Sequence, residues 1–354
     1  MKIGVLEGDD IGREVVPQAV KVMQTAATKS GLSIEWMPLP IGRLAYETFG
    51  HTLPPGTLEK LEALDGWVLG PIGHQAYPKE PNAINPHPIL RKHFDLYANI
   101  RPAKSYPGLP SLHKDVDLVI VRENNEGFQP DRNVVAGCGE FRPSHDMTIS
   151  VRVITRQGSS KVARAAFELA RSRRRKLTAV HKDTVFKLGC GMFAEECRKL
   201  ADEFPDVEYG EAIVDTFALR LVMAPQKYDV IVTTNMFGDI LSDEAAGLVG
   251  GLGLAPGLCA GPRHAMAQAT HGSAPDIAGR NIANPYAMIM SGQMLLDWLG
   301  RTRNEPRAVD AAKRIERAVE RIIAEGAMLT ADIGGQATTT QMGAAIVAMI
   351  DAAQ

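Results

Sequence analysis

Two aspartates, Asp239 and Asp243, lie four residues apart in residues 235–243 (NMFGDILSD). In a helix this spacing places both carboxylates on one face, one turn apart. Carboxylates that close repel each other, and hard oxygen ligands suit Mg²⁺ or Mn²⁺, so we expect a divalent cation between them. The β-branched run before them, residues 228–234, predicts a buried strand leading into the helix. The alternative is a solvated acidic helix start, which the helix dipole favours.

A second segment with possible chemistry is residues 271–279 (HGSAPDIAG). It is rich in small residues and has no helical or strand period, so it predicts a loop. Small residues let a backbone approach a flat ligand or a phosphate, and Asp276 could accept hydrogen bonds from a ribose diol. The usual dinucleotide fingerprint G-x-G-x-x-G after a strand is missing. Residues 247–253 (GLVGGLG) follow a helical pattern and predict a packed turn.

These two segments, in this order, resemble those of the β-decarboxylating dehydrogenases, a family that includes isopropylmalate, isocitrate, homoisocitrate and tartrate/D-malate dehydrogenases. Residues 6–15 (LEGDDIGREV) are similar to the family's G-D-G-I-G-x-E loop, with Asp10 in place of a glycine. The other matching motifs, in order, are residues 90–92 (LRK), 98–104 (ANIRPAK), 121–124 (VREN), 180–183 (VHKD) and 214–216 (VDT). The resemblance covers nearly the whole chain.

The resemblance implies a role for each matched residue. It places Arg91, Arg101 and Arg122 on the substrate carboxylates, and it adds Asp215 to Asp239 and Asp243 as a metal ligand. Lys182 would be the catalytic lysine, and the family supplies it together with Asp215 from the partner subunit, which implies an obligate homodimer with shared active sites. The implied cofactor contacts are Ile11, His271, Gly272, Ser273, Ala274, Asp276, Ile277 and Asn284.

The residue types suit this chemistry. A malate-type substrate has two carboxylates, and a guanidinium fork binds a carboxylate in a bidentate manner. A single arginine more often forms an ion pair or lies at the surface. Arg122 differs because it follows the apolar run 116–121, and a strand that ends at a crevice places its last side chain there. A metal would lower the pKa of the substrate hydroxyl, and a desolvated Lys182 could take its proton. The alternative for Lys182 is an ordinary surface lysine.

Cofactor choice depends on Asp276. A carboxylate beside the adenosine ribose favours two hydroxyls and repels a 2′-phosphate. NADP-using family members have a lysine-tyrosine pair where this chain has Asp276 and Ile277. NAD is therefore favoured over NADP, although the positive charge of Arg280 nearby argues weakly in the other direction.

Three positions depart from the family pattern. Gln129 stands where a tyrosine normally protonates C3, and an amide cannot donate a proton of useful pKa. Thr184 stands where the family often has asparagine. Before Arg91, where isopropylmalate enzymes have a leucine pair, this chain has His87 and Pro88, with Asn85 two residues further back. We therefore expect His87 and Asn85 to line a polar pocket, unless this loop shifts away from the substrate.

The expected function is NAD- and divalent-metal-dependent oxidative decarboxylation of a (2R)-hydroxy acid of the 3-substituted malate type. One alternative is a tartrate- or D-malate-type dehydrogenase, whose pocket needs no apolar lobe. Another is a catalytically weak regulatory subunit, which Gln129 and Thr184 favour. The complete set of aspartates, arginines and Lys182 argues against it.

Composition agrees with a globular enzyme. The chain has 354 residues, of which 45% are hydrophobic and 23% charged, and its net charge is −2. A nucleic-acid partner or a membrane surface is therefore not expected. The basic run 171–176 (RSRRRK) predicts a solvated helix end. The chain begins with a strand-like run and no signal peptide, and its cysteines lack metal spacing, which favours a cytoplasmic protein.

Strands alternate with helices, which predicts an α/β fold. Helices are expected at residues 15–27, 159–171 with Ser159 as N-cap, and 310–325. The resemblance implies a two-domain isopropylmalate/isocitrate dehydrogenase-like fold with a mixed central sheet, not a Rossmann fold. Residues 1–100 and 255–354 would form the larger, cofactor-binding domain. Residues 101–254 would form the inserted, dimerising domain, with an arm at about 130–150.

Overall fold

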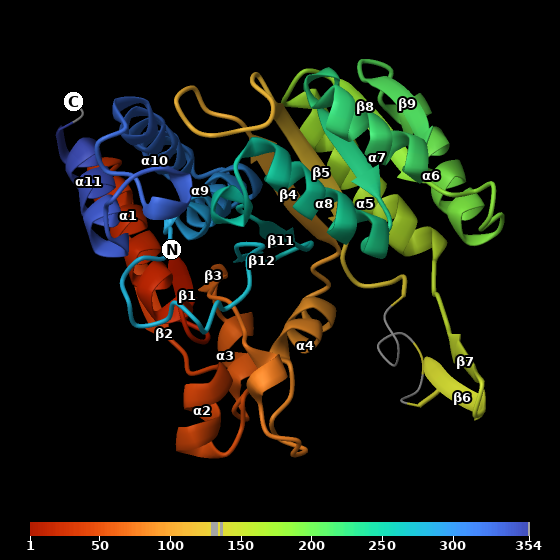
Figure 1. The fold of residues 1–354 in the computed structure, drawn as a ribbon, viewed down its shortest axis with the longest axis horizontal. Helices are drawn as coiled ribbons and strands as arrows, with labels where there is room; N and C mark the ends of the chain where they lie inside the picture. The colour runs from red at the N-terminus through yellow and green to blue at the C-terminus, as the bar shows by residue number, and fades with distance from the viewer. Residues whose placement is uncertain (129–133, 135–136, 353–354) are drawn as a thin grey trace.

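The computed structural model describes residues 1–128, 134 and 137–352. It confirms the α/β fold: in this part of the chain ten strands form one large mixed sheet with helices on both faces (Figure 1). In spatial order the strands are β2 (Glu35–Pro38), β1 (Lys2–Leu6), β3 (Gly66–Leu69), β12 (Ala265–Ala267), β11 (Leu258–Ala260), β4 (Ala98–Lys104), β5 (Asp117–Glu123), β10 (Val230–Thr233), β8 (Lys176–His181) and β9 (Glu208–Ile213).

The direction of the strands changes in the middle of the sheet. In the described residues β11 runs antiparallel to both β12 and β4, and β4 runs antiparallel to β5, while the other neighbours are parallel. The central strands therefore carry side chains from two halves of the chain that are far apart in sequence.

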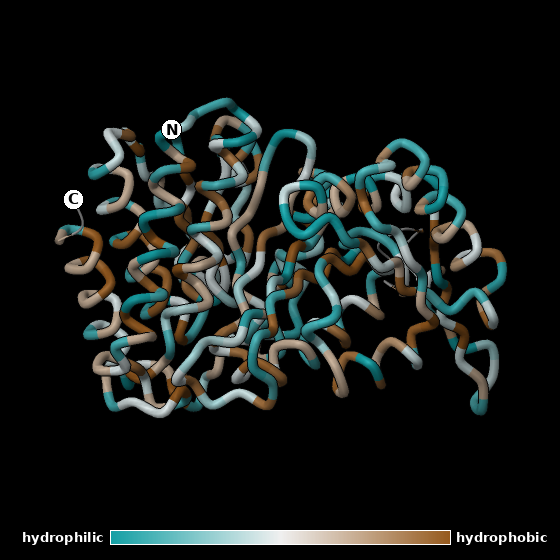
Figure 2. The backbone as a smooth tube through the Cα atoms, turned by 90° about the horizontal axis from the view of Figure 1, so that it is seen from above, coloured by the Kyte–Doolittle hydropathy of each residue, from teal (hydrophilic) through white to brown (hydrophobic). Residues whose placement is uncertain are grey.

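Eleven α-helices flank the sheet in the described residues. They are α1 (Gly12–Lys29), α2 (Gly42–Phe49), α3 (Thr57–Glu62), α4 (Pro86–His93), α5 (Arg156–Arg171), α6 (Gly189–Glu203), α7 (Val214–Met223), α8 (Asn235–Val249), α9 (Tyr286–Thr302), α10 (Pro306–Glu325) and α11 (Thr339–Ala352). Short 3₁₀ turns are η1 (His74–Ala76), η2 (Pro225–Lys227), η3 (Leu252–Leu254) and η4 (Ala331–Ile333). Along the helices hydrophobic and hydrophilic residues alternate, as expected for helices with one buried face (Figure 2).

The strands β3, β5, β8 and β10 are buried on both faces, which explains their nearly continuous apolar sequences. On β10, Val230 and Val232 pack in a cluster with α5 and α6, whereas Ile231 packs on the opposite face with α7 and α8. At the other end of the sheet, α1, α9, α10 and α11 cover one face. Two hydrophobic clusters thus lie mainly within residues 1–100 and 254–354, and two within residues 98–249.

The predicted helices exist, but they begin earlier than the apolar periodicity indicates. The first predicted helix is α1, and the third is α10. The prediction that Ser159 is an N-cap is wrong. Thr155 caps α5 and accepts a hydrogen bond from the backbone N–H of Gly158 at 3.0 Å, while Ser159 is buried inside the helix. Thr155 precedes a polar first turn, so apolar spacing alone could not locate it.

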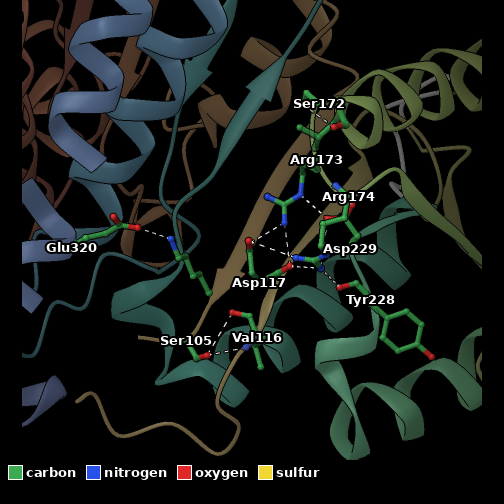
Figure 3. A network of polar contacts seen from close by, with 11 residues as sticks. Ser105, Val116, Asp117, Ser172, Arg173, Arg174, Tyr228, Asp229 and Glu320 are labelled. Atoms are coloured by element: carbon green, nitrogen blue, oxygen red, sulfur yellow. Dashed lines mark hydrogen bonds and ion pairs between the residues drawn. The ribbon is translucent and has the colours of Figure 1, made fainter. Parts of the chain in front are cut away.

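The basic run at the end of α5 is mostly exposed, in agreement with the prediction of a solvated helix end, but Arg173 and Arg174 also pair with acid groups, of which Asp229 is buried. Arg173 donates to Oδ1 of Asp229 at 2.7 Å and to Oδ1 of Asp117 at 2.8 Å, and the backbone N–H of Arg174 donates to Oδ2 of Asp229 at 2.8 Å (Figure 3). Asp229 is 1% exposed. This network joins the end of α5 to the starts of β5 and β10, which carry the candidate site at their other ends.

We expect Asp229→Asn to lower the free energy of unfolding by about 3 kcal/mol, because it leaves Arg173 without its buried partner. The measurement is urea unfolding followed by circular dichroism. Asp206→Asn is the matched control, since Asp206 pairs with Arg171 at the surface, and we expect a change of about 0.5 kcal/mol or less. Equal losses for the two variants would contradict a structural role for the buried pair.

A two-stranded hairpin, β6 (Glu140–Ser144) and β7 (Met147–Ser150), projects from the body of the molecule (Figure 1). All of its residues are exposed. It lies in the stretch predicted to form a dimer arm. In the described residues no helix combines the length and apolar character needed to cross a membrane.

Candidate active site

Two buried arginines on the central strands form the base of the candidate site. Arg101 is on β4 and Arg122 is on the neighbouring strand β5, and both contact residues of α8. Their side chains are only 9% and 5% exposed. Gly238 on α8 permits this packing, because a Cβ there would lie 2.6 Å from Cβ of Arg122. A larger residue at this position would push α8 away from the sheet.

Asp239 and Asp243 lie on the face of α8 that meets these arginines, the arrangement that their spacing predicts. Nη1 of Arg101 is 3.1 Å from Oδ1 of Asp239 and 3.7 Å from Oδ1 of Asp243, and Arg122 also pairs with Asp239. The two aspartate side chains are 52% and 55% exposed. The guanidiniums therefore supply positive charge between the carboxylates, and about half of each acidic side chain remains accessible.

The cluster carries more positive charge and more donors than its protein partners use. Burial lowers the pKa of Arg101 and of Arg122, and Arg91 lowers both further. Burial raises the pKa of Asp243, and Arg101 opposes this shift. The Nε atoms of Arg91 and Arg122 are buried without a hydrogen-bond partner among the described residues. Such a cluster suits a ligand with more than one carboxylate.

Gln268 links two predicted substrate residues, although the sequence pattern did not identify it. Its Oε1 accepts a hydrogen bond from Nη2 of Arg91 at 3.2 Å, and its Nε2 lies 2.5 Å from Nε2 of His87. Asn85 instead caps α4, since its Oδ1 accepts from the backbone N–H of His87 at 3.1 Å. Gln268 comes directly after the apolar strand β12, and this position is the sequence feature from which it could have been identified as a site residue.

Lys182 and Asp215 form a separate ion pair. Lys182 follows β8, Asp215 is in the first turn of α7, and their hydrogen bond lowers the pKa of Asp215. The described residues contain no group of three His, Cys, Asp or Glu side chains that could hold a metal ion. One chain therefore does not bring Asp215 to Asp239 and Asp243. Gln129 lies outside the described residues.

The predicted cofactor loop lies against the N-terminal loop. The backbone N–H of Ile11 donates to the carbonyl of Ser273 at 3.1 Å, and the N–H of Gly279 donates to Oε1 of Glu14 at 2.6 Å. Ala274 has a φ of 44°, a left-handed conformation that is uncommon for alanine. The structure thus brings together the two segments that the resemblance assigns to one cofactor.

The other predicted cofactor residues have different surroundings. Burial lowers the pKa of His271, and its Nδ1 lies 3.0 Å from the carbonyl of Gly272. Asp276 is exposed and Ile277 is half-buried. Asn284 is buried, and its side-chain amide hydrogen-bonds to a neighbouring carboxylate and to a backbone N–H. The protein itself therefore holds Asn284 in place, while Asp276 is accessible.

A buried glutamate beside the arginines was not predicted. Glu123 ends β5, is 3% exposed, and accepts hydrogen bonds from the backbone N–H groups of Asn125 at 2.6 Å and Glu126 at 2.8 Å. Burial raises its pKa to about 7 against these hydrogen bonds, which lower it. Asn235 lies 3.4 Å from Glu123 and accepts a hydrogen bond from Arg122 at 2.6 Å.

We expect stability to fall as the pH rises from about 5 to 8, by up to about 3 kcal/mol from Glu123. Between about pH 5 and 7 the folded protein keeps the proton on Glu123, whereas the unfolded chain, with a pKa of 4.5, has lost it. Raising the pH therefore favours the unfolded chain. The measurement is urea unfolding at several pH values for wild type and Glu123→Gln. The variant should lose this part of the pH dependence, and parallel profiles would show that Glu123 titrates normally.

Comparisons with known proteins agree with this geometry. A family model described as isocitrate/isopropylmalate dehydrogenase matches residues 2–346. The chain is 41% identical over 355 residues to a 3-isopropylmalate dehydrogenase of Archaeoglobus fulgidus, with 99% of both proteins covered. It is 42% identical to an isocitrate/homoisocitrate dehydrogenase of Thermus thermophilus, with 98% of this chain and 97% of that protein covered.

A solved structure gives the same result. The isocitrate dehydrogenase of Methylococcus capsulatus superposes with a TM-score of 0.87 at 41% identity and 99% coverage of both chains. These relatives carry different substrate names at nearly equal identity, so they establish the family and leave the substrate open. The resemblance found in the sequence is confirmed: the chain belongs to the isocitrate/isopropylmalate dehydrogenase family of β-decarboxylating hydroxy-acid dehydrogenases.

Proposed function

We propose that this protein catalyses NAD- and divalent-metal-dependent oxidative decarboxylation of a (2R)-hydroxy acid of the 3-substituted malate type. The main supporting observation is that Arg101 and Arg122 pair with the carboxylates of Asp239 and Asp243, while Arg91 lies close enough to lower the pKa of both arginines. A substrate with two carboxylates would be bound by the guanidiniums, and its hydroxyl would lie toward the aspartates.

The donor set suits Mg²⁺ or Mn²⁺. Asp239 and Asp243 offer accessible carboxylate oxygens one helical turn apart, and hard oxygen ligands are those that these cations prefer. Two carboxylates are too few for a complete site, so we infer that the substrate and Asp215 of a second subunit complete it. A bound metal would lower the pKa of the substrate hydroxyl and stabilise the enolate that remains after loss of CO₂.

Lys182 is the proposed general base for the hydroxyl proton. It is 26% exposed and its amine pairs with Asp215, so it is held at a fixed place near a metal ligand. We propose that Lys182 and Asp215 act on the active site of the partner subunit.

The surfaces of α7 and α8 support a homodimer. Both helices expose large apolar side chains next to the two half-sites, namely Leu219, Val222, Met223, Met236 and Ile240. Apolar exposure of this kind on neighbouring helices is typical of a subunit interface. The projecting β6–β7 hairpin would form the dimer arm, and the hydrophobic clusters support the division at about residues 100 and 255.

NAD is the proposed cofactor. The 271–279 loop and Ile11 provide its binding segments, and the exposed carboxylate of Asp276 would accept hydrogen bonds from a ribose diol and repel a 2′-phosphate. The immediate surroundings of Arg91 are polar, because Gln268 contacts both Arg91 and His87. This favours a polar or carboxylated C3 substituent, or a tartrate- or D-malate-type substrate, over an isopropyl group.

The test is NADH formation, followed by absorbance, with Mn²⁺ and NAD. The panel contains 3-isopropylmalate, isocitrate, homoisocitrate, D-malate and tartrate, each with and without a chelator. We expect one preferred substrate, with activity lost on chelation. Activity that survives chelation would contradict the metal site, and NADP preferred over NAD would contradict the role of Asp276. Silence on the whole panel would favour a catalytically weak subunit.

A further inference from the structure

Arg43 and Asp10 form an ion pair beside the proposed cofactor segments. The pair lies where the N-terminal loop, the start of α2 and the loop around Gly73 meet. Asp10 is in the N-terminal loop, Arg43 is the second residue of α2, and Nη1 of Arg43 is 3.4 Å from Oδ1 of Asp10. A Cβ built on Gly73 would lie 3.0 Å from Oδ2 of Asp10, 3.0 Å from Oγ of Ser273 and 3.6 Å from Nη2 of Arg43. The pair is therefore packed directly against the cofactor loop.

Asp10 is held in an unusual state for a surface-loop carboxylate. Its backbone has a φ of 49°, in the left-handed region that glycine and, among other residues, asparagine and aspartate adopt most readily. Its side chain is 9% exposed, and its Oδ2 has no hydrogen-bond partner among the described residues. Burying a carboxylate with one unpaired oxygen costs free energy, so this arrangement of Asp10 and Arg43 calls for a functional explanation.

Arg43 is the accessible member of the pair. Its side chain is 40% exposed, and its backbone N–H is fixed by Oδ1 of Asp9 at 2.7 Å. Asp9 is fully engaged, because it also accepts from the N–H of Gly73 at 2.8 Å and from the hydroxyl of Tyr77 at 2.5 Å. An anionic cofactor that enters beside Asp9 and Asp10 requires a cation, and Arg43 places one there.

We propose that Arg43 binds the diphosphate of the dinucleotide cofactor and that Asp10 is the positioning residue that holds its guanidinium over Gly73. The inference rests on the proposed dinucleotide cofactor. A planar guanidinium binds phosphate oxygens in pairs, and a carboxylate behind it fixes its orientation. Asp10 stands where the family motif has a glycine; it adopts a left-handed backbone conformation, and its carboxylate contacts the side chain of Arg43 at the start of α2.

The experiment is calorimetric titration of the full-length protein, without metal or substrate, with NAD, ADP-ribose, NADP and adenosine. Arg43→Gln should weaken NAD, ADP-ribose and NADP by about 10- to 100-fold and leave adenosine unchanged, because adenosine has no phosphate. Binding of NAD by wild type should also fall more steeply with added NaCl than binding by the variant. Arg303→Gln is the matched control, since Arg303 is also 40% exposed and pairs with Asp65 away from these loops.

The variant Asp10→Asn distinguishes a positioning role of Asp10 toward Arg43 from simple repulsion between its charge and the cofactor phosphates. Asparagine tolerates the left-handed backbone, so the fold should be kept, and a thermal melt checks this. If Asp10 positions Arg43, the Asp10→Asn variant should bind NAD several-fold more weakly than wild type. Tighter binding of NAD by this variant would mean that Asp10 only repels the phosphates, and would overturn its positioning role. Unchanged NAD binding by Arg43→Gln, or a loss confined to NADP, would overturn the diphosphate contact. A wild type that binds none of the nucleotides would overturn the cofactor assignment as well.

Discussion

Lys182→Met should lower kcat by about 10²- to 10⁴-fold while the KM for substrate changes little, because it removes the proposed general base for the hydroxyl proton and leaves the arginine cluster intact. The measurement is steady-state NADH formation with the preferred substrate. Lys199→Met is the control, since Lys199 is an exposed lysine paired with Glu196 on α6. A near-wild-type kcat for Lys182→Met would exclude this lysine from proton transfer.

The same variant tests whether the active site is shared between subunits. Mixed dimers of Lys182→Met and Asp239→Asn would contain one site with both wild-type residues if Lys182 acts across the interface. Random re-association should then restore about a quarter of wild-type activity, since half the dimers are mixed and each has one intact site. Mixtures that stay as inactive as the two parents would place Lys182 and Asp239 in the same chain's site.

Asp239→Asn is expected to weaken Mn²⁺ binding and to lower kcat/KM by about 100-fold or more, because Asp239 is a proposed metal ligand and asparagine has one oxygen fewer and no negative charge. The measurement is NADH formation as a function of Mn²⁺ concentration, with unfolding monitored because Arg101 and Arg122 lose a charged partner. Asp310→Asn is the control, since Asp310 is similarly exposed and pairs with Arg314 on α10. Wild-type turnover that still requires metal would remove Asp239 from the metal site.

Local sequence could predict the parts of this protein that depend on neighbouring residues. The four-residue spacing of Asp239 and Asp243 places them on one helix face, and apolar runs identified β5 and β10. Arg122 could be expected in a crevice because it comes at the end of such a run. These inferences need only the 3.6-residue and two-residue periods of helix and strand. Thr155 shows the limit of this approach, because a polar cap has no period.

Long-range packing decided the rest. No pattern within residues 265–270 shows that Gln268 reaches both Arg91 and His87, since these pairs are 177 and 181 residues apart. The same holds for Asp229, which fixes Arg173 from 56 residues away, and for Arg43 beside Asp10.

The sequence by itself determined the family and the α/β elements, because side-chain type and short-range spacing specify chemistry and local structure; the residues that it assigns to substrate carboxylates and a metal stay a prediction. Only the tertiary structure decided that β4 and β5 carry their arginines beneath α8, that Glu123 is buried beside them, and that one chain keeps Asp215 apart from Asp239 and Asp243. Charge pairing and burial are set by which distant segments pack together, and that depends on the whole sheet rather than on any one motif.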